Sequence, residues 1–110
     1  MQVPEIVGEK RENPGIQLYV DDWLWTKLIS LNKGEKAEQH VHEFDHPTIV
    51  ATGAIKVWID GKYQGVVFSP SIITIKAQQK HEFLAIIDSV ICCVHNLRGE
   101  GYPAISEELY

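Results

Sequence analysis

Residues 34–53 read GEKAEQHVHEFDHPTIVATG and place three histidines, His40, His42 and His46, between two glycines. A fourth histidine, His81, follows the polar turn KAQQK later in the chain. Imidazole is the commonest protein ligand for divalent transition metals, so the cluster predicts a metal site. Residues two apart in a strand point to the same face, and His40 and His42 can therefore both face the interior of a barrel.

We expect the other two histidines to reach the same point from other strands. His46 stands just before Pro47, where we expect the chain to bend into the next strand. His81 opens a later strand and shares one face with Phe83 and Ala85. Four imidazoles meeting inside a barrel would form a metal site shielded from bulk water on most sides.

Other interpretations of this cluster stay open. A lone histidine is more often a surface or hydrogen-bonded residue than a ligand, but a His-x-His pair backed by two more histidines is hard to explain by core packing. Asp45 and Glu43 are alternative oxygen ligands. On a strand, Glu43 would face away from His42, which makes it the weaker of the two.

The rest of the chain alternates short strands with turn signals. Asp60-Gly61 is a strong hairpin signal, and no convincing amphipathic helix of ten or more residues is present. Strands that recur about every ten residues are typical of an all-β sandwich or barrel. We expect strands at residues 23–31, 48–52, 54–59, 62–68, 71–75, 81–86 and 90–97.

Length and composition indicate one globular domain. The chain has 110 residues, of which 45% are hydrophobic. We expect an N-terminal arm at residues 1–16, a barrel at 17–98 and a C-terminal tail at 99–110. The net charge of -5 argues against a nucleic-acid partner. No apolar run is long enough for a membrane helix, and no secretory signal precedes the first strand.

The two cysteines, Cys92 and Cys93, are adjacent. A disulfide between neighbours is strained and would not hold a fold together. Their main interpretation is a pair of reduced thiols in a strand, which is consistent with a cytoplasmic protein.

The histidine pattern resembles a known family motif. Gly34-x5-His40-x-His42-x3-His46-x6-Gly53 is similar to the first cupin motif, in which a glutamate usually stands at the position of His46. His81 resembles the histidine of the second cupin motif, although the Pro-x-Gly turn before it and the later asparagine are missing here. The resemblance spans roughly residues 17–98.

This resemblance implies a double-stranded β-helix, the cupin jelly-roll barrel, which is often a homodimer. It is closest to the small single-domain cupins with four histidine ligands. It therefore implies one divalent transition metal (Mn, Fe, Ni, Zn or Cu) held by His40, His42, His46 and His81.

Replacing glutamate by histidine changes the charge of the site. Three histidines and a glutamate leave a divalent metal with a net charge of about +1, whereas four neutral histidines leave about +2. Such a site should favour hydroxide or an anionic oxygen substrate. His95 and Cys93 share a strand face; if it is the inner face, His95 is a candidate catalytic proton-transfer group and Cys93 an oxidisable thiol. Plain core lining is the alternative for both.

Three functions remain open at this point. The first is a metal-dependent enzyme, dioxygenase-like, acting on a small organic molecule. The second is a non-catalytic module that binds a metal or a small ligand. The third is a metal-free isomerase of the sugar-epimerase kind, which needs a His–Asp pair and a basic pocket. The chain has only two arginines, Arg11 and Arg98, which disfavours the third.

Ligation by four histidines predicts a pH-dependent metal affinity. Protons compete with the metal for the imidazoles, so the affinity should fall as the pH drops below about 6.5, the unperturbed histidine pKa. Metal titrations at pH 8 and pH 5 test this, and an equal affinity at both would count against four-histidine ligation.

Overall fold

The computed structural model describes residues 15–38, 41 and 44–97. Every element of regular secondary structure in this part of the chain is a strand, which confirms the all-β prediction. The strands are β1 (Gly15–Val20), β2 (Leu24–Leu31), β3 (Lys36–Glu38), β4 (His46–Thr52), β5 (Ala54–Ile59), β6 (Lys62–Phe68), β7 (Ser71–Ile75), β8 (His81–Ala85) and β9 (Ser89–Asn96).

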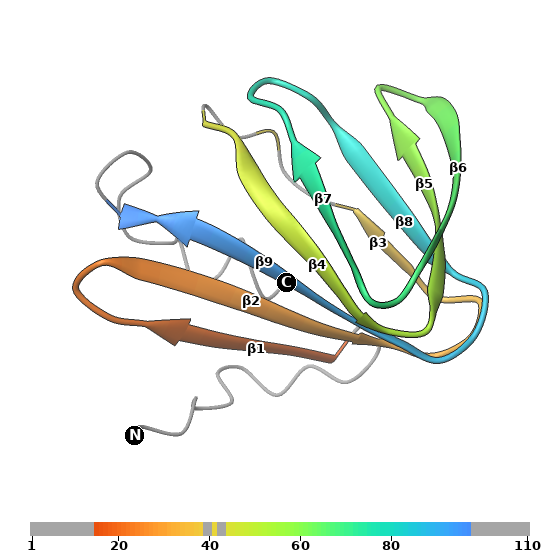
Figure 1. The fold of residues 1–110 in the computed structure, drawn as a ribbon, viewed down its shortest axis with the longest axis horizontal. Helices are drawn as coiled ribbons and strands as arrows, with labels where there is room; N and C mark the ends of the chain where they lie inside the picture. Colours follow the sequence, from red (N-terminus) through yellow and green to blue (C-terminus); the bar gives the residue numbers. More distant parts are fainter. Residues whose placement is uncertain (1–14, 39–40, 42–43, 98–110) are drawn as a thin grey trace.

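The strands form two antiparallel sheets that face each other (Figure 1). One sheet has five strands in the order β1-β2-β9-β4-β7, and the other has four in the order β3-β8-β5-β6. Consecutive strands often lie in different sheets, as β4 and β5 do, so the chain crosses repeatedly between the two layers. This is the crossing pattern of a jelly roll rather than of a simple meander.

The hairpin expected at Asp60-Gly61 is confirmed. Ile59 pairs with Lys62, which leaves a two-residue loop between β5 and β6. Both loop residues have positive φ, 50° at Asp60 and 79° at Gly61. This is the backbone of a type I′ turn, whose twist matches that of the flanking strands.

Two strands fall outside the sequence expectation. β1 begins at Gly15, so Gly15 and Ile16 of the expected arm are paired with β2. β3 has only three residues, too few to produce a recognisable alternation. β4 also begins earlier than expected, because its pairing with β7 already starts at His46. Its pairing with β9 starts only at Thr48, after Pro47, which has no backbone N–H to donate.

The interior between the sheets changes character along the strands. One end is a packed aliphatic core in which Ile29 pairs with Ile91 and Ile91 with Val50, all nearly inaccessible to solvent. On the opposite sheet, Ile55 pairs with Ala85 in the same core. Burial of these side chains supplies the main driving force for closing the two sheets.

Toward the other end of the same strands, histidines replace the aliphatic side chains. Trp25 pairs with His95, and Ile59 pairs with His81 on the opposite sheet. His46 begins β4 beside Ile75. The fold therefore brings polar side chains together at one end of an otherwise apolar interior.

Within residues 15–38, 41 and 44–97, no helix has the length and apolar character needed to cross a membrane.

Gly53 shows why the second glycine of the histidine motif is required. Its φ is +87°, and a Cβ added there would overlap Ser89 Oγ and come within 2.6 Å of the carbonyl oxygen of Asp88. Ser89 is fixed at this point because the backbone N–H of Ala54 donates to its hydroxyl at 3.1 Å. Only glycine lets β9 start this close to the β4–β5 turn.

We expect Gly53→Ala to destabilise the fold more than Gly34→Ala. Gly34 has the same φ of +87°, but an added Cβ would meet nothing within 4 Å. Gly34→Ala should therefore cost only the left-handed backbone strain, about 1–2 kcal/mol. Gly53→Ala should add roughly 1–3 kcal/mol of overpacking.

Equilibrium denaturation of both variants measures this difference in the free energy of unfolding. Equal losses of stability would mean that the chain relaxes around Gly53 and that the close approach of Ser89 is not a constraint.

Candidate metal centre

Three histidines reach one end of the interior from three different strands. His46 is the first residue of β4, His81 the first of β8, and His95 lies next to the last residue of β9. Because β9 runs antiparallel to β4, the end of β9 lies beside the start of β4. Each of the three side chains is at most 2% exposed.

The three rings lie close together. The ring centroids of His46 and His95 are 4.3 Å apart, and those of His46 and His81 are 5.5 Å apart. His46 Nδ1 also lies 3.4 Å from the carbonyl oxygen of Pro47. His46 is therefore the middle member of the group and links the two sheets.

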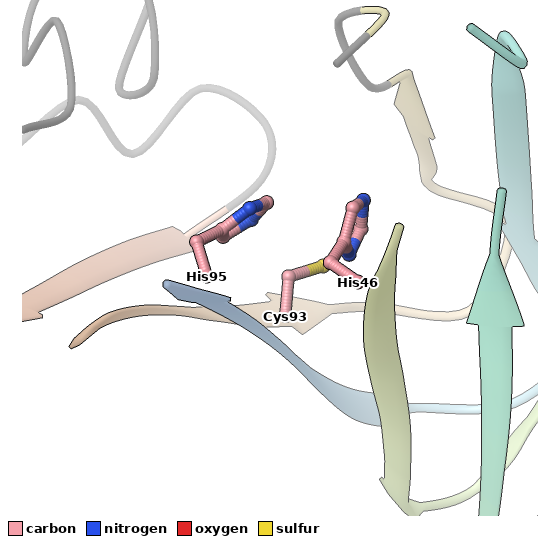
Figure 2. Close-up of side chains that lie close together, drawn as sticks. All are labelled: His46, Cys93 and His95. Atoms are coloured by element: carbon pink, nitrogen blue, oxygen red, sulfur yellow. The ribbon is translucent and has the colours of Figure 1, made fainter. Parts of the chain in front are cut away.

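Cys93 completes the group from the same strand as His95. Figure 2 shows the side chains of Cys93, His95 and His46 rising from one face of β9 and the start of β4. One donor atom from each of the three lies within 4.8 Å of the others. Cys93 is completely buried, and its Sγ lies 3.3 Å from Thr48 Oγ1. Cys93 and His95 thus lie on the inner face of β9. The sequence alone did not determine which face of this strand points inward.

The expected four-histidine set is only partly within the described residues. His40 and His42 lie outside them. The ring centroids of His46 and His81 lie 5.5 Å apart, but His81 is not among the described residues whose donor atoms lie within 4.8 Å of one another. The four-histidine ligand set therefore stays a prediction. The structure adds His95 and Cys93 to the same group, with His95 as near to His46 as any expected ligand.

The donor types suit a transition metal. Zn–N bonds are about 2.0–2.1 Å long and Zn–S bonds about 2.3 Å, so ligand atoms around one ion lie up to about 4 Å apart. The spacing of His46, Cys93 and His95 is close to this range. Imidazole and thiolate favour Zn, Fe, Ni and Cu, whereas Mn prefers more oxygen ligands.

Trp25 is a neighbour of the site that the histidine pattern does not reveal. Its ring stacks on that of His95, with centroids 3.9 Å apart and planes inclined by 12°. Trp25 is 2% exposed, so this stack holds the plane of the His95 ring from the β2 side. Trp23, two residues earlier, is 63% exposed because it lies in the turn before β2.

Lys27 also belongs to the inner surface, and its burial was not expected from the sequence. It is only 4% exposed and pairs with Cys93. The alternation along β2 does indicate that Lys27 faces inward, since Lys27 shares a face with the buried residues Trp25 and Ile29. Among the buried side chains that the structure describes, Lys27 and the histidines are the basic groups and none is a carboxylate.

Asp45, considered as an oxygen ligand, is engaged elsewhere. Its carboxylate accepts a hydrogen bond from the backbone N–H of Ala77 at 2.7 Å and lies 3.6 Å from Lys76 Nζ. The Ala77 hydrogen bond, assisted by the charge of Lys76, lowers the pKa of Asp45 below its usual value. Asp45 therefore ties the start of β4 to the loop that leads into β8, and so connects the two strands that carry His46 and His81.

Comparisons with known proteins identify the fold. No family model and no curated protein matches the chain. Solved structures do match the chain. An RmlC-like cupin from Shewanella frigidimarina is 17% identical with a TM-score of 0.68, over 84% of this chain and 83% of that one.

Two further structures agree with this fold. KdgF from Halomonas sp. is 21% identical with a TM-score of 0.61, over 74% of this chain and 78% of that one. An uncharacterised protein with a double-stranded β-helix domain from Klebsiella pneumoniae is 16% identical with a TM-score of 0.68, over 83% of each chain. The chain therefore has the double-stranded β-helix fold of the cupins, as expected from its motif.

Because Asp45 connects the strands that carry His46 and His81, we expect its substitution to change the metal affinity, although Asp45 is not a ligand. Asp45→Ala removes the hydrogen bond to Ala77 and should lower metal affinity by about threefold to tenfold, the effect of losing one such bond. Asp45→Asn keeps an acceptor oxygen and should stay close to the wild type.

Titration of both variants with Co²⁺ or Zn²⁺, together with thermal melts, checks this. If Asp45→Ala binds metal as tightly as Asp45→Asn does, the loop does not help to position His46 and His81.

Proposed function

We propose that this protein is a metal-binding cupin that holds one divalent transition metal among its buried histidines. The observation that carries the proposal is that His46, Cys93 and His95 each place one donor atom within 4.8 Å of the others. The ring of His81, on the opposite sheet, has its centroid 5.5 Å from that of His46. Motif resemblance adds His40 and His42, which makes His40, His42, His46 and His81 the ligand set that we propose. His95 and Cys93 are then the inner neighbours of that set.

Packing alone is a poor explanation of this cluster. Burying a polar group costs free energy that an apolar side chain of similar size would not. The ring centroids of His81 and His95 lie within 5.5 Å of that of His46, at the end of a core of aliphatic residues and phenylalanine, so three imidazoles carry that cost together. A bound cation offsets it, because each imidazole contributes a nitrogen lone pair to the ion.

We further propose that the site is catalytic, with oxygenase-type chemistry on a small organic molecule. The metal, when bound, would supply Lewis acidity or redox chemistry. The chain itself contributes a water-poor interior, neutral histidine donors that leave the metal charge largely uncompensated, and the buried side chain of Lys27 directly opposite Cys93. These features favour an anionic oxygen group on the substrate. His95, held by the stack with Trp25, is the candidate for moving a proton.

The alternative is a non-catalytic metal or small-ligand module built from the same residues. The complete burial of Cys93 and near-complete burial of the histidines favour this alternative, because a closed site holds metal without exchanging ligands. A metal-free isomerase has less support: Asp45 is bonded to Ala77, and Asp88 accepts a hydrogen bond from the backbone N–H of Lys33 at 2.8 Å.

Metal analysis of protein purified without a His-tag or added metal tests the proposal. We expect about one transition metal per chain, and a loss of affinity of at least about tenfold in His46→Ala and in His81→Ala. His46→Glu should retain metal, because it restores an anionic ligand at the same position. Thr52→Ala, an exposed position at the end of β4 away from His46, is the control and should behave like the wild type.

Two results would contradict the proposal. A protein without metal that takes up none of the first-row ions has no metal function. An unchanged metal content and spectrum in His46→Ala would remove His46 from the ligand set. Oxygen consumption and azide binding by the Co²⁺ form then separate the enzyme from the closed module, since only a site with exchangeable positions binds azide.

A further inference from the structure

One thiol and two imidazoles meet on neighbouring strands of a single sheet. His46 begins β4, and Cys93 and His95 lie on β9, which pairs with β4. One donor atom from each residue lies within 4.8 Å of the others (Figure 2). This group needs no residue from the opposite sheet. Cys93 and His95 are also not among the ligands that the motif resemblance implies, so the three residues form a candidate set of their own.

The strand register holds the three donors on the same face of the sheet. Cys93 and His95 are two residues apart in β9, so both side chains point inward. Thr48 pairs with Cys93, and its hydroxyl oxygen lies 3.3 Å from the sulfur. His46 comes two residues before Thr48, and its ring centroid is 4.3 Å from that of His95. Donor atoms around one ion lie up to about 4 Å apart, so movements of about 1 Å close the set on an ion.

Both imidazole rings have neighbours that fix their orientation. Trp25 stacks on His95 with ring centroids 3.9 Å apart. His46 Nδ1 lies 3.4 Å from the carbonyl oxygen of Pro47. When Nδ1 carries the proton, it donates to this carbonyl, and Nε2 keeps its lone pair for an ion. Outer contacts of this kind orient the histidine ligands of metal sites and strengthen metal binding.

Burial decides which ion the group can hold. Its three side chains are almost inaccessible to solvent, and no carboxylate is among the buried side chains in the described part of the chain. With one thiolate and two neutral imidazoles, a divalent ion keeps a net charge of about +1, whereas a monovalent ion is neutralised. Because an uncompensated charge is costly to bury, the group favours the monovalent ion.

We propose that His46, Cys93 and His95 form a three-coordinate site for the thiophilic ion Cu(I). Thiolate is a soft ligand that favours Cu(I), zinc and iron–sulfur clusters, and Cu(I) is the monovalent ion among these. Cu(I) also accepts three ligands, whereas a structural Zn²⁺ takes four. On binding, the Cys93 thiol releases its proton to solvent and the sulfur bonds to the ion, while copper stays in the +1 state.

This site goes beyond the proposed function and competes with it. His46 belongs both to this group and to the four-histidine set proposed for a divalent metal. One ion therefore excludes the other, and bound Cu(I) should prevent uptake of Zn²⁺. The copper site itself needs neither His81 nor a divalent metal, so it depends on the proposed function only through this competition.

Anaerobic Cu(I) titration of the full-length protein against a chromogenic Cu(I) chelator tests the inference. X-ray absorption at the copper edge reports the ligand atoms, and we expect one sulfur and two nitrogens. Cys93→Ser should weaken Cu(I) binding at least about a hundredfold, more than the loss of an outer contact costs. Cys92→Ser is the matched control, because Cys92 is the adjacent thiol on the outer face, and should bind like the wild type.

His81→Ala distinguishes this site from the four-histidine set. His81 lies on the opposite sheet and is not part of the group, so His81→Ala should keep the wild-type affinity for Cu(I). Its affinity for Zn²⁺ should fall, as the proposed function requires. Equal losses of Cu(I) affinity in His81→Ala and Cys93→Ser would mean that the ion binds between the two sheets, which overturns the inference.

The remaining outcomes separate the inference from the proposed function. Copper without a sulfur neighbour in the wild-type protein overturns the inference, and this measurement does not depend on the folding of any variant. Equal Cu(I) affinities of Cys92→Ser and Cys93→Ser overturn it as well. Cu(I) bound through Cys93 in a protein that takes up no divalent metal leaves the inference standing and overturns the proposed function.

Discussion

The position of β9 between β2 and β4 is the constraint on which the interior depends. Antiparallel pairing on both sides fixes its register, with Lys27 and Thr48 directly opposite Cys93. Side chains alternate along a strand, so this register turns Cys93 and His95 inward and Cys92 toward the outer face. A slip by one residue would reverse every one of these directions and remove the candidate metal centre along with the core. Chemistry and packing in this barrel are therefore set by the same hydrogen-bond ladder.

The same ladder explains how a polar group is tolerated inside so small a domain. The aliphatic residues occupy one end of the strands, and the histidines occupy the other. Most of the apolar core is therefore not interrupted by polar side chains. Burial of Ile29, Ile91 and Phe83 offsets the cost of burying His46 and His81. A scattered arrangement of the same side chains would interrupt the core at several places, whereas the observed one confines the cost to a single end.

Local turn chemistry and alternation made much of this fold predictable from the sequence. Asp60-Gly61 specified a two-residue hairpin because few other pairs adopt its positive φ values. The motif resemblance named His46 and His81 as ligands, which stays a prediction. It did not indicate the nearness of His95 to His46, because that depends on which face of β9 turns inward. Lys27 was missed because a lysine in a strand is usually exposed. β3 depends on pairing with β8, a strand distant in the sequence, and no local pattern encodes such pairing.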